Sequence, residues 1–225
     1  MAISTTPVQQ KVASTATGNS LAITLDSTPT AGNLLVITVH ITLSYTVTSI
    51  TGGGCTWVKA VSNASTRACE IWYGENNDGS SASITVNKNG YNTDWGYNIS
   101  EWSGVATSSS LDTTANDTDT VTNTSSIPSV TPVASSNCLL IAASTSGSTR
   151  TAGATDSYTN LTDVNNTYCN AGYRVVSSAS GGYTTTWTVN NNYQTHQNCH
   201  AVFKAAAGGG GGGTPTRVVP QIITW

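Results

Sequence analysis

The sequence contains few charged residues. Asp, Glu, Lys and Arg together make up 8% of the 225 residues, against about a quarter in an average soluble protein. The basic residues are scattered singly, so there is no basic stripe that could collect phosphate groups, and we expect no nucleic-acid partner. Ser, Thr, Asn and Gly must solvate the surface instead. This composition suits the exterior of a particle or an extracellular protein better than a cytosolic enzyme.

Long apolar segments are also missing. No run approaches the roughly 20 apolar residues that a helix needs to cross a bilayer, so no membrane span is expected. The N-terminal stretch MAISTTP has neither the charged region nor the apolar region of a classical signal peptide. We therefore expect a chain that is synthesised in the cytoplasm without such a signal.

Cysteine is present in an odd number, five, and without a CxxC pair. This argues against a zinc site and against a disulfide framework. The favoured interpretation is that the thiols are small buried apolar groups, and one or two disulfides remain the alternative. The cysteines are Cys55, Cys69, Cys138, Cys169 and Cys199.

Alternating apolar and polar residues fill most of the chain, between turns rich in Gly, Asn, Asp and Ser. Residues 34–41, LLVITVHI, are almost continuously apolar and predict a strand buried on both faces. No segment has a helical period with caps. The pattern predicts an all-β protein, an antiparallel β-sandwich of the jelly-roll or Ig-like type. Further strands are expected at 67–73, 82–86, 97–102, 138–143, 169–176, 183–189 and 199–203.

Three connections have recognisable turn chemistry. Asp78-Gly79 lies between two strand-like runs and predicts a hairpin that joins 67–73 to 82–86. The glycine triplet 52–54 predicts a turn before the strand that contains Trp57. Residues 108–132 are rich in Thr, Ser, Asn and Asp and predict an exposed connection.

The two halves of the sequence repeat one another at an offset of about 100 residues. LLVITVHI matches CLLIAAS, the strand with Cys69 matches the strand with Cys169, and the strand ending in Trp102 matches the one ending in Phe203. We predict a duplicated strand order. A single sandwich whose halves supply equivalent strands is favoured, and two successive small sandwiches are the alternative. The predicted sandwich covers 1–207, with pseudo-repeats at about 20–107 and 133–204.

The composition changes abruptly after residue 207. Residues 208–213 are an unbroken glycine run, which predicts a flexible hinge. Residues 214–225, TPTRVVPQIITW, contain two prolines that oppose a helix and favour an extended form. We predict an anchoring peptide that pairs with a sheet edge or fills a groove on a neighbouring subunit. Its apolar anchor side chains are Val218, Val219, Ile222, Ile223 and Trp225.

The pattern PTAGNLLVITVHI…W…IWYG…ITV…ISEWSGV…LD is similar to β-sandwich modules of phage structural proteins, of the head-decoration or tail-fibre type, and of bacterial surface proteins. The resemblance covers about residues 20–204 and consists of strand patterns and aromatic positions. It implies a scaffolding or adhesion role, and it carries over no functional residue.

Catalytic and metal-binding patterns are weak. Glu70 and Glu101 could flank a glycosidic bond if neighbouring strands brought them together, but isolated acids beside aromatic residues are common in sandwiches. His196 and His200 are spaced for a shared metal on a helix, yet on a strand they lie about 13 Å apart. His40 is expected to be a hydrogen-bonded core residue.

Two further ligand sites have some support from the sequence. Asp117 and Asp119 could hold calcium together with Asp112, although no EF-hand-like loop surrounds them. The aromatic residues Tyr91 and Trp95 lie in the loop-like stretch NGYNTDW and are the candidates for stacking against sugar rings.

These observations together predict a non-enzymatic structural subunit of a virion or extracellular assembly, of the capsid-decoration or fibre type, which docks through its C-terminal tail. Its expected partners are copies of itself or a capsid or other shell protein, and its expected location is the surface of that assembly. No cofactor and no metal are expected. A carbohydrate-binding or adhesin module is the alternative, with surface glycans as partners, and a glycoside hydrolase is a third hypothesis.

Overall fold

The computed structural model describes residues 2–91, 94–121, 124–133, 137–145, 155–161, 169–177, 181–188 and 194–207, and all statements on structure refer to these residues. Their regular elements are all β-strands, and the strand pairing is antiparallel throughout. The described residues include no helix long and apolar enough to cross a membrane. The polyglycine hinge and the anchoring peptide, 208–225, lie outside the described residues.

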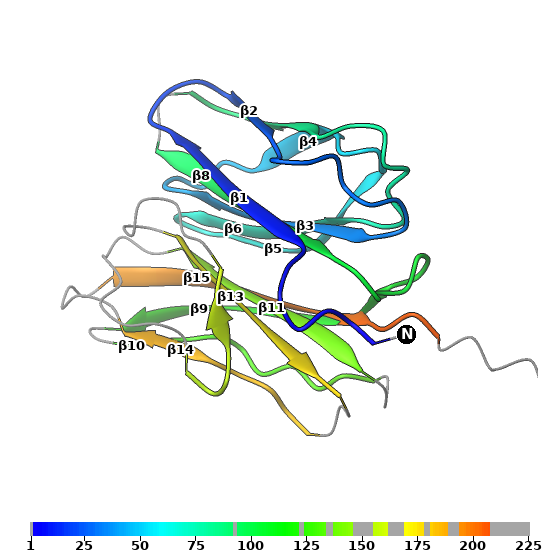
Figure 1. The fold of residues 1–225 in the computed structure, drawn as a ribbon. Helices are drawn as coiled ribbons and strands as arrows, with labels where there is room; N and C mark the ends of the chain where they lie inside the picture. The colour runs from blue at the N-terminus through cyan, green and yellow to red at the C-terminus, as the bar shows by residue number, and fades with distance from the viewer. Residues whose placement is uncertain are drawn as a thin grey trace, which may run out of the picture.

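The first half of the chain builds two sheets that face each other (Figure 1). The larger sheet has the strand order β1–β8–β3–β6–β5, and the smaller one has the order β2–β7–β4. The strands are β1 (Gln9–Thr15), β2 (Ser20–Thr24), β3 (Leu34–Ile41), β4 (Val47–Gly52), β5 (Trp57–Ala64), β6 (Ala68–Gly74), β7 (Ser83–Lys88) and β8 (Trp95–Trp102).

The second half builds a corresponding pair. Its larger sheet has the order β12–β13–β11–β15–β9, and its smaller sheet pairs β10 with β14. The strands are β9 (Leu111–Val121), β10 (Thr124–Ser126), β11 (Cys138–Thr145), β12 (Thr159–Asn160), β13 (Cys169–Val176), β14 (Thr186–Thr188) and β15 (Gln194–Lys204).

The duplicated strand order is confirmed. Read in reverse, the larger sheet of the second half has the order β9–β15–β11–β13–β12, and each strand takes the place of β1, β8, β3, β6 or β5 in turn. In the smaller sheets, β10 and β14 correspond to β2 and β7. The strands of each half pair only with strands of the same half among the named sheets, and the two halves are here called the first and the second unit.

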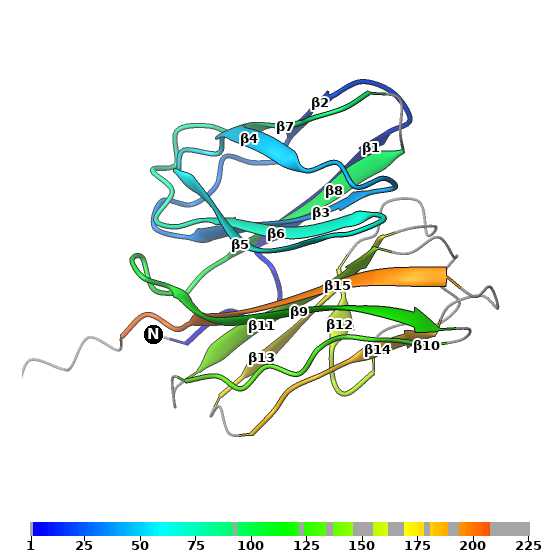
Figure 2. The ribbon, with the colours of Figure 1, turned by 180° about the vertical axis from the view of Figure 1, so that it is seen from behind.

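The two units stack with their larger sheets face to face, as the two opposite views show (Figures 1 and 2). Three apolar clusters fill the spaces between the layers. The first unit encloses one around Ile37, Tyr97 and Trp95, and the second encloses one around Leu140 and Trp187. The third cluster lies between the units and contains residues of both. Continuously apolar strands such as β3 are buried on both faces for this reason.

The turn at Asp78-Gly79 forms, but the predicted hairpin is wrong. Asn76 and Gly79 have positive φ values of 48° and 70°, as a tight turn requires. However, β6 pairs with β3 and β5, whereas β7 pairs with β2 and β4. The turn therefore carries the chain from one sheet to the other, because β3 and β5 already occupy both hydrogen-bonding edges of β6.

The exposed connection predicted for 108–132 is also wrong in part. Residues 111–121 form β9, which pairs along β15 from Leu111 to Val121. β9 is an edge strand with many exposed positions, so Thr, Asn and Asp can occupy them. Its β-branched threonines favour the extended backbone, a preference that the polar composition concealed.

Candidate functional site: the inter-unit junction and an open sheet edge

Aromatic rings join the two units at their junction. Tyr73 of β6 packs edge-on against Phe203 of β15, with ring centroids 5.4 Å apart. Trp102 of β8 packs in the same way against Tyr173 of β13, with centroids 4.8 Å apart. Trp102 and Phe203 are fully buried. Edge-to-face pairs of this kind add about 1 kcal/mol beyond the burial of their area.

These contacts are reciprocal under the sequence repeat. Tyr73 and Tyr173 are equivalent positions, and so are Trp102 and Phe203. Tyr73 of the first unit therefore contacts Phe203 of β15, and Tyr173 of the second unit contacts the equivalent residue of β8, Trp102. Such reciprocity is the mark of a two-fold interface between identical subunits. The chain is thus built like a homodimer whose two subunits are joined into one polypeptide.

Polar contacts also cross the junction. The Thr145 hydroxyl donates to the carbonyl of Ala68 (3.0 Å), and the Gln197 amide donates to the hydroxyls of Ser65 (3.0 Å) and Thr66 (3.2 Å). The chain crosses between the units at the opposite end of these strands, where Val105 bridges to Ala205. The two units are therefore fixed to each other by buried groups on several strands.

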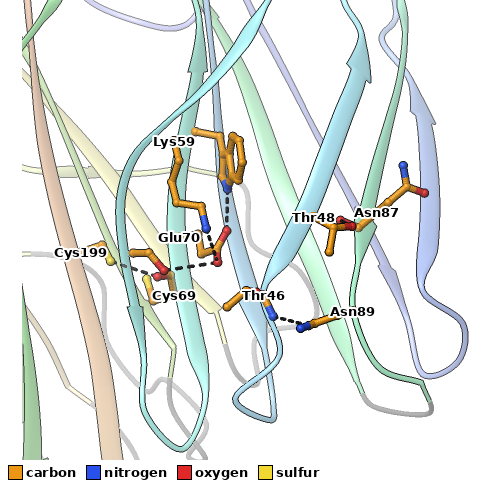
Figure 3. A network of polar contacts seen from close by, with 10 residues as sticks. Thr46, Thr48, Lys59, Cys69, Glu70, Asn87, Asn89 and Cys199 are labelled. Atoms are coloured by element: carbon orange, nitrogen blue, oxygen red, sulfur yellow. Dashed lines mark hydrogen bonds and ion pairs between the residues drawn. The ribbon is translucent and has the colours of Figure 1, made fainter.

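Two thiols meet inside the junction (Figure 3). The Cys199 thiol donates to the backbone carbonyl of Cys69 at 3.1 Å, and both residues are buried. Burial raises the pKa of the Cys69 thiol well above its usual value, and the neighbouring Cys199 raises it further. Burial likewise raises the pKa of Cys138 to about 11 and that of Cys55 to about 12. Cys55, Cys69, Cys138 and Cys199 are not disulfide-bonded.

Glu70 is a fully buried carboxylate in the first unit (Figure 3). It accepts hydrogen bonds from the Trp72 indole (2.6 Å), the Lys59 ammonium (3.2 Å) and the Ser62 hydroxyl (3.3 Å). The Lys59 ammonium also lies 5.0 Å from the centroid of the Trp72 ring. Every donor comes from β5 or β6, so this network fixes the edge of the larger sheet.

Glu101 occupies a separate network. Its carboxylate accepts hydrogen bonds from the Gln9 amide (2.6 Å), the Asn33 amide (2.6 Å) and the backbone N–H of Thr30 (2.8 Å). Glu101 and Glu70 lie on opposite sides of β3, opposite Leu35 and Val39 respectively. Standard strand spacings then place them about 16 Å apart. Glycosidase carboxylates lie at most about 9.5 Å apart, so this pair does not have glycosidase geometry.

The histidines lie in the interior. Both ring nitrogens of His200 are bonded, one to the Tyr158 hydroxyl (2.8 Å) and one to the Pro128 carbonyl (3.0 Å). His196 is buried with no partner for either ring nitrogen among the described residues, and Nδ1 of His40 also lacks one. The expectation that His40 is hydrogen-bonded is therefore not met at Nδ1. Burial lowers the pKa of His40 and of His200 to about 4.

The three aspartates considered for calcium do not come together. Asp112 accepts from the backbone N–H of Val133 (2.7 Å) near one end of β9. Asp117 accepts from the Asn198 amide (2.9 Å) further along the strand. Within the described part of the chain, no three His, Cys, Asp or Glu side chains converge in a way that could hold a metal ion.

The two residues predicted to stack against sugar rings, Tyr91 and Trp95, differ in their exposure to solvent. Tyr91 is 66% exposed, as a stacking residue requires. Trp95 is 1% exposed, so the expectation that it is available for stacking is wrong. Trp95 begins β8, and its ring faces the core of the first unit, with the Lys88 ammonium 5.4 Å from its centroid. Strand alternation places it on the same face as Tyr97 and Ile99.

A groove of about 460 Å³ lies along the outer edge of β13. The edge strand β12 pairs with β13 only at Gly172 and Tyr173, so the last part of β13 continues beyond it. Before β12 the chain turns away at Asp156 and Ser157, whose φ values are 55° and 62°. The groove is lined by Thr5, Ser157, Thr159, Tyr173, Arg174, Val175, Val176, Ser177 and Tyr183.

Sequence reasoning missed the residues of the junction and of this groove. The repeat itself contains a signal for the junction, because Tyr73 and Tyr173 stand at equivalent positions. Nothing in the sequence marks Arg174 or Val175, since their position beyond β12 depends on where β12 begins. The predicted anchor residues Val218, Val219, Ile222, Ile223 and Trp225 lie outside the described residues.

Comparison with protein-family models, with curated proteins and with solved structures gives no match to this chain, so its site is defined by its own geometry alone.

Proposed function

We propose that this chain is a non-enzymatic structural subunit of a virion or extracellular assembly, of the capsid-decoration or fibre type, which docks through its C-terminal tail. The observation that supports it most is the junction, where two equivalent units share one buried core. A shared core makes a stiff block rather than two domains on a string. A stiff, charge-poor block with an apolar peptide behind a glycine hinge is suited to being tethered to a neighbour.

The buried polar network around Glu70 supports the same proposal. Its three donors hold the carboxylate within the sheet rather than presenting it to a cleft. Structural carboxylates are satisfied in this way, whereas a catalytic pair needs two groups across a substrate-sized gap.

Light scattering tests the proposal. The experiment compares the full-length chain with a chain that ends at Ala207. Each chain is measured over a concentration series, first alone and then mixed with purified virions from the source of the sequence. The proposal expects the full-length chain alone to form larger species or to bind particles. The truncated chain, which retains both units, serves as the control for folding. Monomers of both forms that also fail to bind particles would contradict the proposal.

A carbohydrate-binding module is the second candidate, and it is supported by the exposure of Tyr91. Leu43, in the loop between β3 and β4, is also exposed, at 45%, and Tyr45 of the same loop packs over Gly90. An exposed ring of this kind could stack on a sugar. Binding on a glycan array that is lost in Tyr91→Ala but kept in Val133→Ala, an exposed residue of the second unit, would favour this candidate. No binding across a broad array would count against it.

A further inference from the structure

Two thiols from different units meet in the apolar cluster of the junction (Figure 3). Cys69 belongs to β6 of the first unit, and Cys199 belongs to β15 of the second. Strand alternation turns Cys69 to the same face as Ile71, and Cys199 to the same face as Ala201. The Cys199 thiol contacts the Cys69 carbonyl at 3.1 Å, although 130 residues separate the two positions. The packing of the units therefore brings these thiols together.

The backbones of the two units approach closely at this point. Two short side chains of the second unit reach neighbouring carbonyls of β6, since the Cys199 thiol contacts that of Cys69 and the Thr145 hydroxyl contacts that of Ala68 at 3.0 Å. A cysteine Sγ lies about 2.8 Å from its own Cα, so the Cys199 Cα lies within about 6 Å of the Cys69 carbonyl oxygen. Disulfides join Cα atoms about 4.4–6.8 Å apart. The contact therefore holds the two backbones near the separation that a disulfide requires.

The other thiols whose side chains the structure describes lie elsewhere. Cys138 belongs to the apolar cluster inside the second unit. Cys55 lies beside Gly74, at the end of β6. Cys69, in contrast, interacts directly with Cys199, which raises the pKa of the Cys69 thiol. A selective disulfide is expected where two thiols are already in contact.

We propose that Cys69 and Cys199 form a disulfide that locks the two units together when the chain meets a low-molecular-weight disulfide such as oxidised glutathione. One cysteine thiolate attacks the small disulfide and releases one small thiolate, which leaves a mixed disulfide on the protein. The second cysteine thiolate then attacks the protein sulfur of that mixed disulfide and releases the other small thiolate. The two thiol protons pass to the small thiolates, so the protein is oxidised and the small disulfide is reduced to two thiols. This inference does not rest on the proposed function, because an unassembled chain has the same junction.

The reaction should be slow while the junction is closed. Cys69 and Cys199 are 1% and 0% exposed, so a small disulfide reaches them only when the junction opens. Burial also raises the pKa of the Cys69 thiol, which leaves little of the reactive thiolate at neutral pH. The chain should therefore stay reduced in a reducing compartment, and it should become locked as it folds or opens in an oxidising one.

Refolding in a glutathione mixture tests the proposal. One sample of the reduced full-length chain is unfolded in urea and refolded with oxidised glutathione in excess of reduced glutathione, and a second sample is kept folded in the same mixture. Remaining thiols are blocked with iodoacetamide. Trypsin leaves each of the five cysteines in a separate peptide, so mass spectrometry assigns the bond. We expect peptides 68–88 and 175–204 to be linked, more slowly in the folded sample. Absence of this bond from the refolded sample, or a bond between any other pair, overturns the proposal.

Urea denaturation shows whether the bond acts as a lock. The oxidised parent chain should unfold at a higher urea concentration than the reduced chain, because the bond restricts the unfolded chain. Cys199→Ala retains a small apolar side chain but cannot form the bond, so its midpoint should not respond to glutathione. Cys138→Ala removes another buried thiol and is the matched control, which should keep both the bond and the shift. A parent midpoint that does not rise on oxidation, or a rise that survives in Cys199→Ala, overturns the proposal.

Discussion

Tyr73 of the first unit packs edge-on against Phe203 of the second, and the equivalent residues Tyr173 and Trp102 make the reciprocal contact. The junction is therefore a two-fold interface within one chain rather than an incidental contact between neighbours. Because the apolar cluster around it draws residues from both large sheets, neither unit can lose its fold without exposing part of the other. The two units should behave as one cooperative body.

The first prediction concerns this junction. Phe203→Ala removes a fully buried ring and should lower the free energy of unfolding by about 4 kcal/mol. Urea denaturation followed by fluorescence should show one transition for both units, at a lower midpoint than in the parent chain. Tyr91→Ala, which removes an exposed ring, is the control and should change the stability by less than about 0.5 kcal/mol. Two separate transitions in the parent chain would contradict the shared core.

The second prediction concerns the glycine turn after β4. Gly52, Gly53 and Gly54 all have positive φ, and a Cβ on Gly52 would lie 2.0 Å from the carbonyl oxygen of Ser83. Gly52→Ala should therefore cost about 3 kcal/mol in thermal or chemical denaturation, since backbone strain and a clash add. Gly18→Ala is the matched control, because φ is also positive, at 81°, but no atom lies within 4 Å. It should cost about 1 kcal/mol. If both variants lower the free energy of unfolding equally, the backbone around Gly52 shifts to remove the clash with Ser83, and the prediction is wrong.

The third prediction concerns Glu70. Glu70→Ala leaves the Trp72 indole and the Ser62 hydroxyl without their acceptor, and it should lower the free energy of unfolding by about 3 kcal/mol. Lys59→Met should cost less than about 1 kcal/mol, because the lysine side chain is 34% exposed and is screened by solvent. Denaturant titrations of both variants at neutral pH check this order. A larger loss for Lys59→Met would mean that the ion pair, not the neutral donors, holds the carboxylate.

The fourth prediction concerns pH. The pKa values of His40 and His200 fall from 6.5 to about 4 because burial disfavours the imidazolium. The unfolded chain therefore takes up protons before the folded one, and their contribution to stability is intact above pH 6.5 and is lost as the pH falls toward 4. Between pH 7 and pH 5, each of these two histidines should lower the free energy of unfolding by about 2 kcal/mol. Denaturant titrations at pH 7 and pH 5 measure the loss. Burial lowers the pKa of His196 as well, so His200→Gln should reduce this pH dependence without abolishing it, and an unchanged slope would contradict the assignment.

The fold class and the repeat follow from local patterns in the sequence. Alternation of apolar and polar residues requires strands, and continuous apolar runs such as Leu34–Ile41 require burial on both faces. The equivalence of Trp102 with Phe203 is also visible in the sequence, because each is the last apolar residue of a corresponding strand. These features are local, so a single sequence is enough to specify them.

Which strands pair, and which side chains are buried, depends on how the sheets pack in three dimensions. The turn at Asp78-Gly79 has the same local chemistry in a hairpin and in a connection between sheets, and only the neighbours of β6 and β7 distinguish them. Trp95 follows a polar loop, yet the facing sheet buries it. Val175 has an ordinary strand sequence, and it lies beyond β12 because β12 begins only at Thr159, opposite Tyr173. Strand pairing and burial depend on contacts with residues that are distant in the chain. A local sequence pattern indicates only the backbone conformation that each segment prefers.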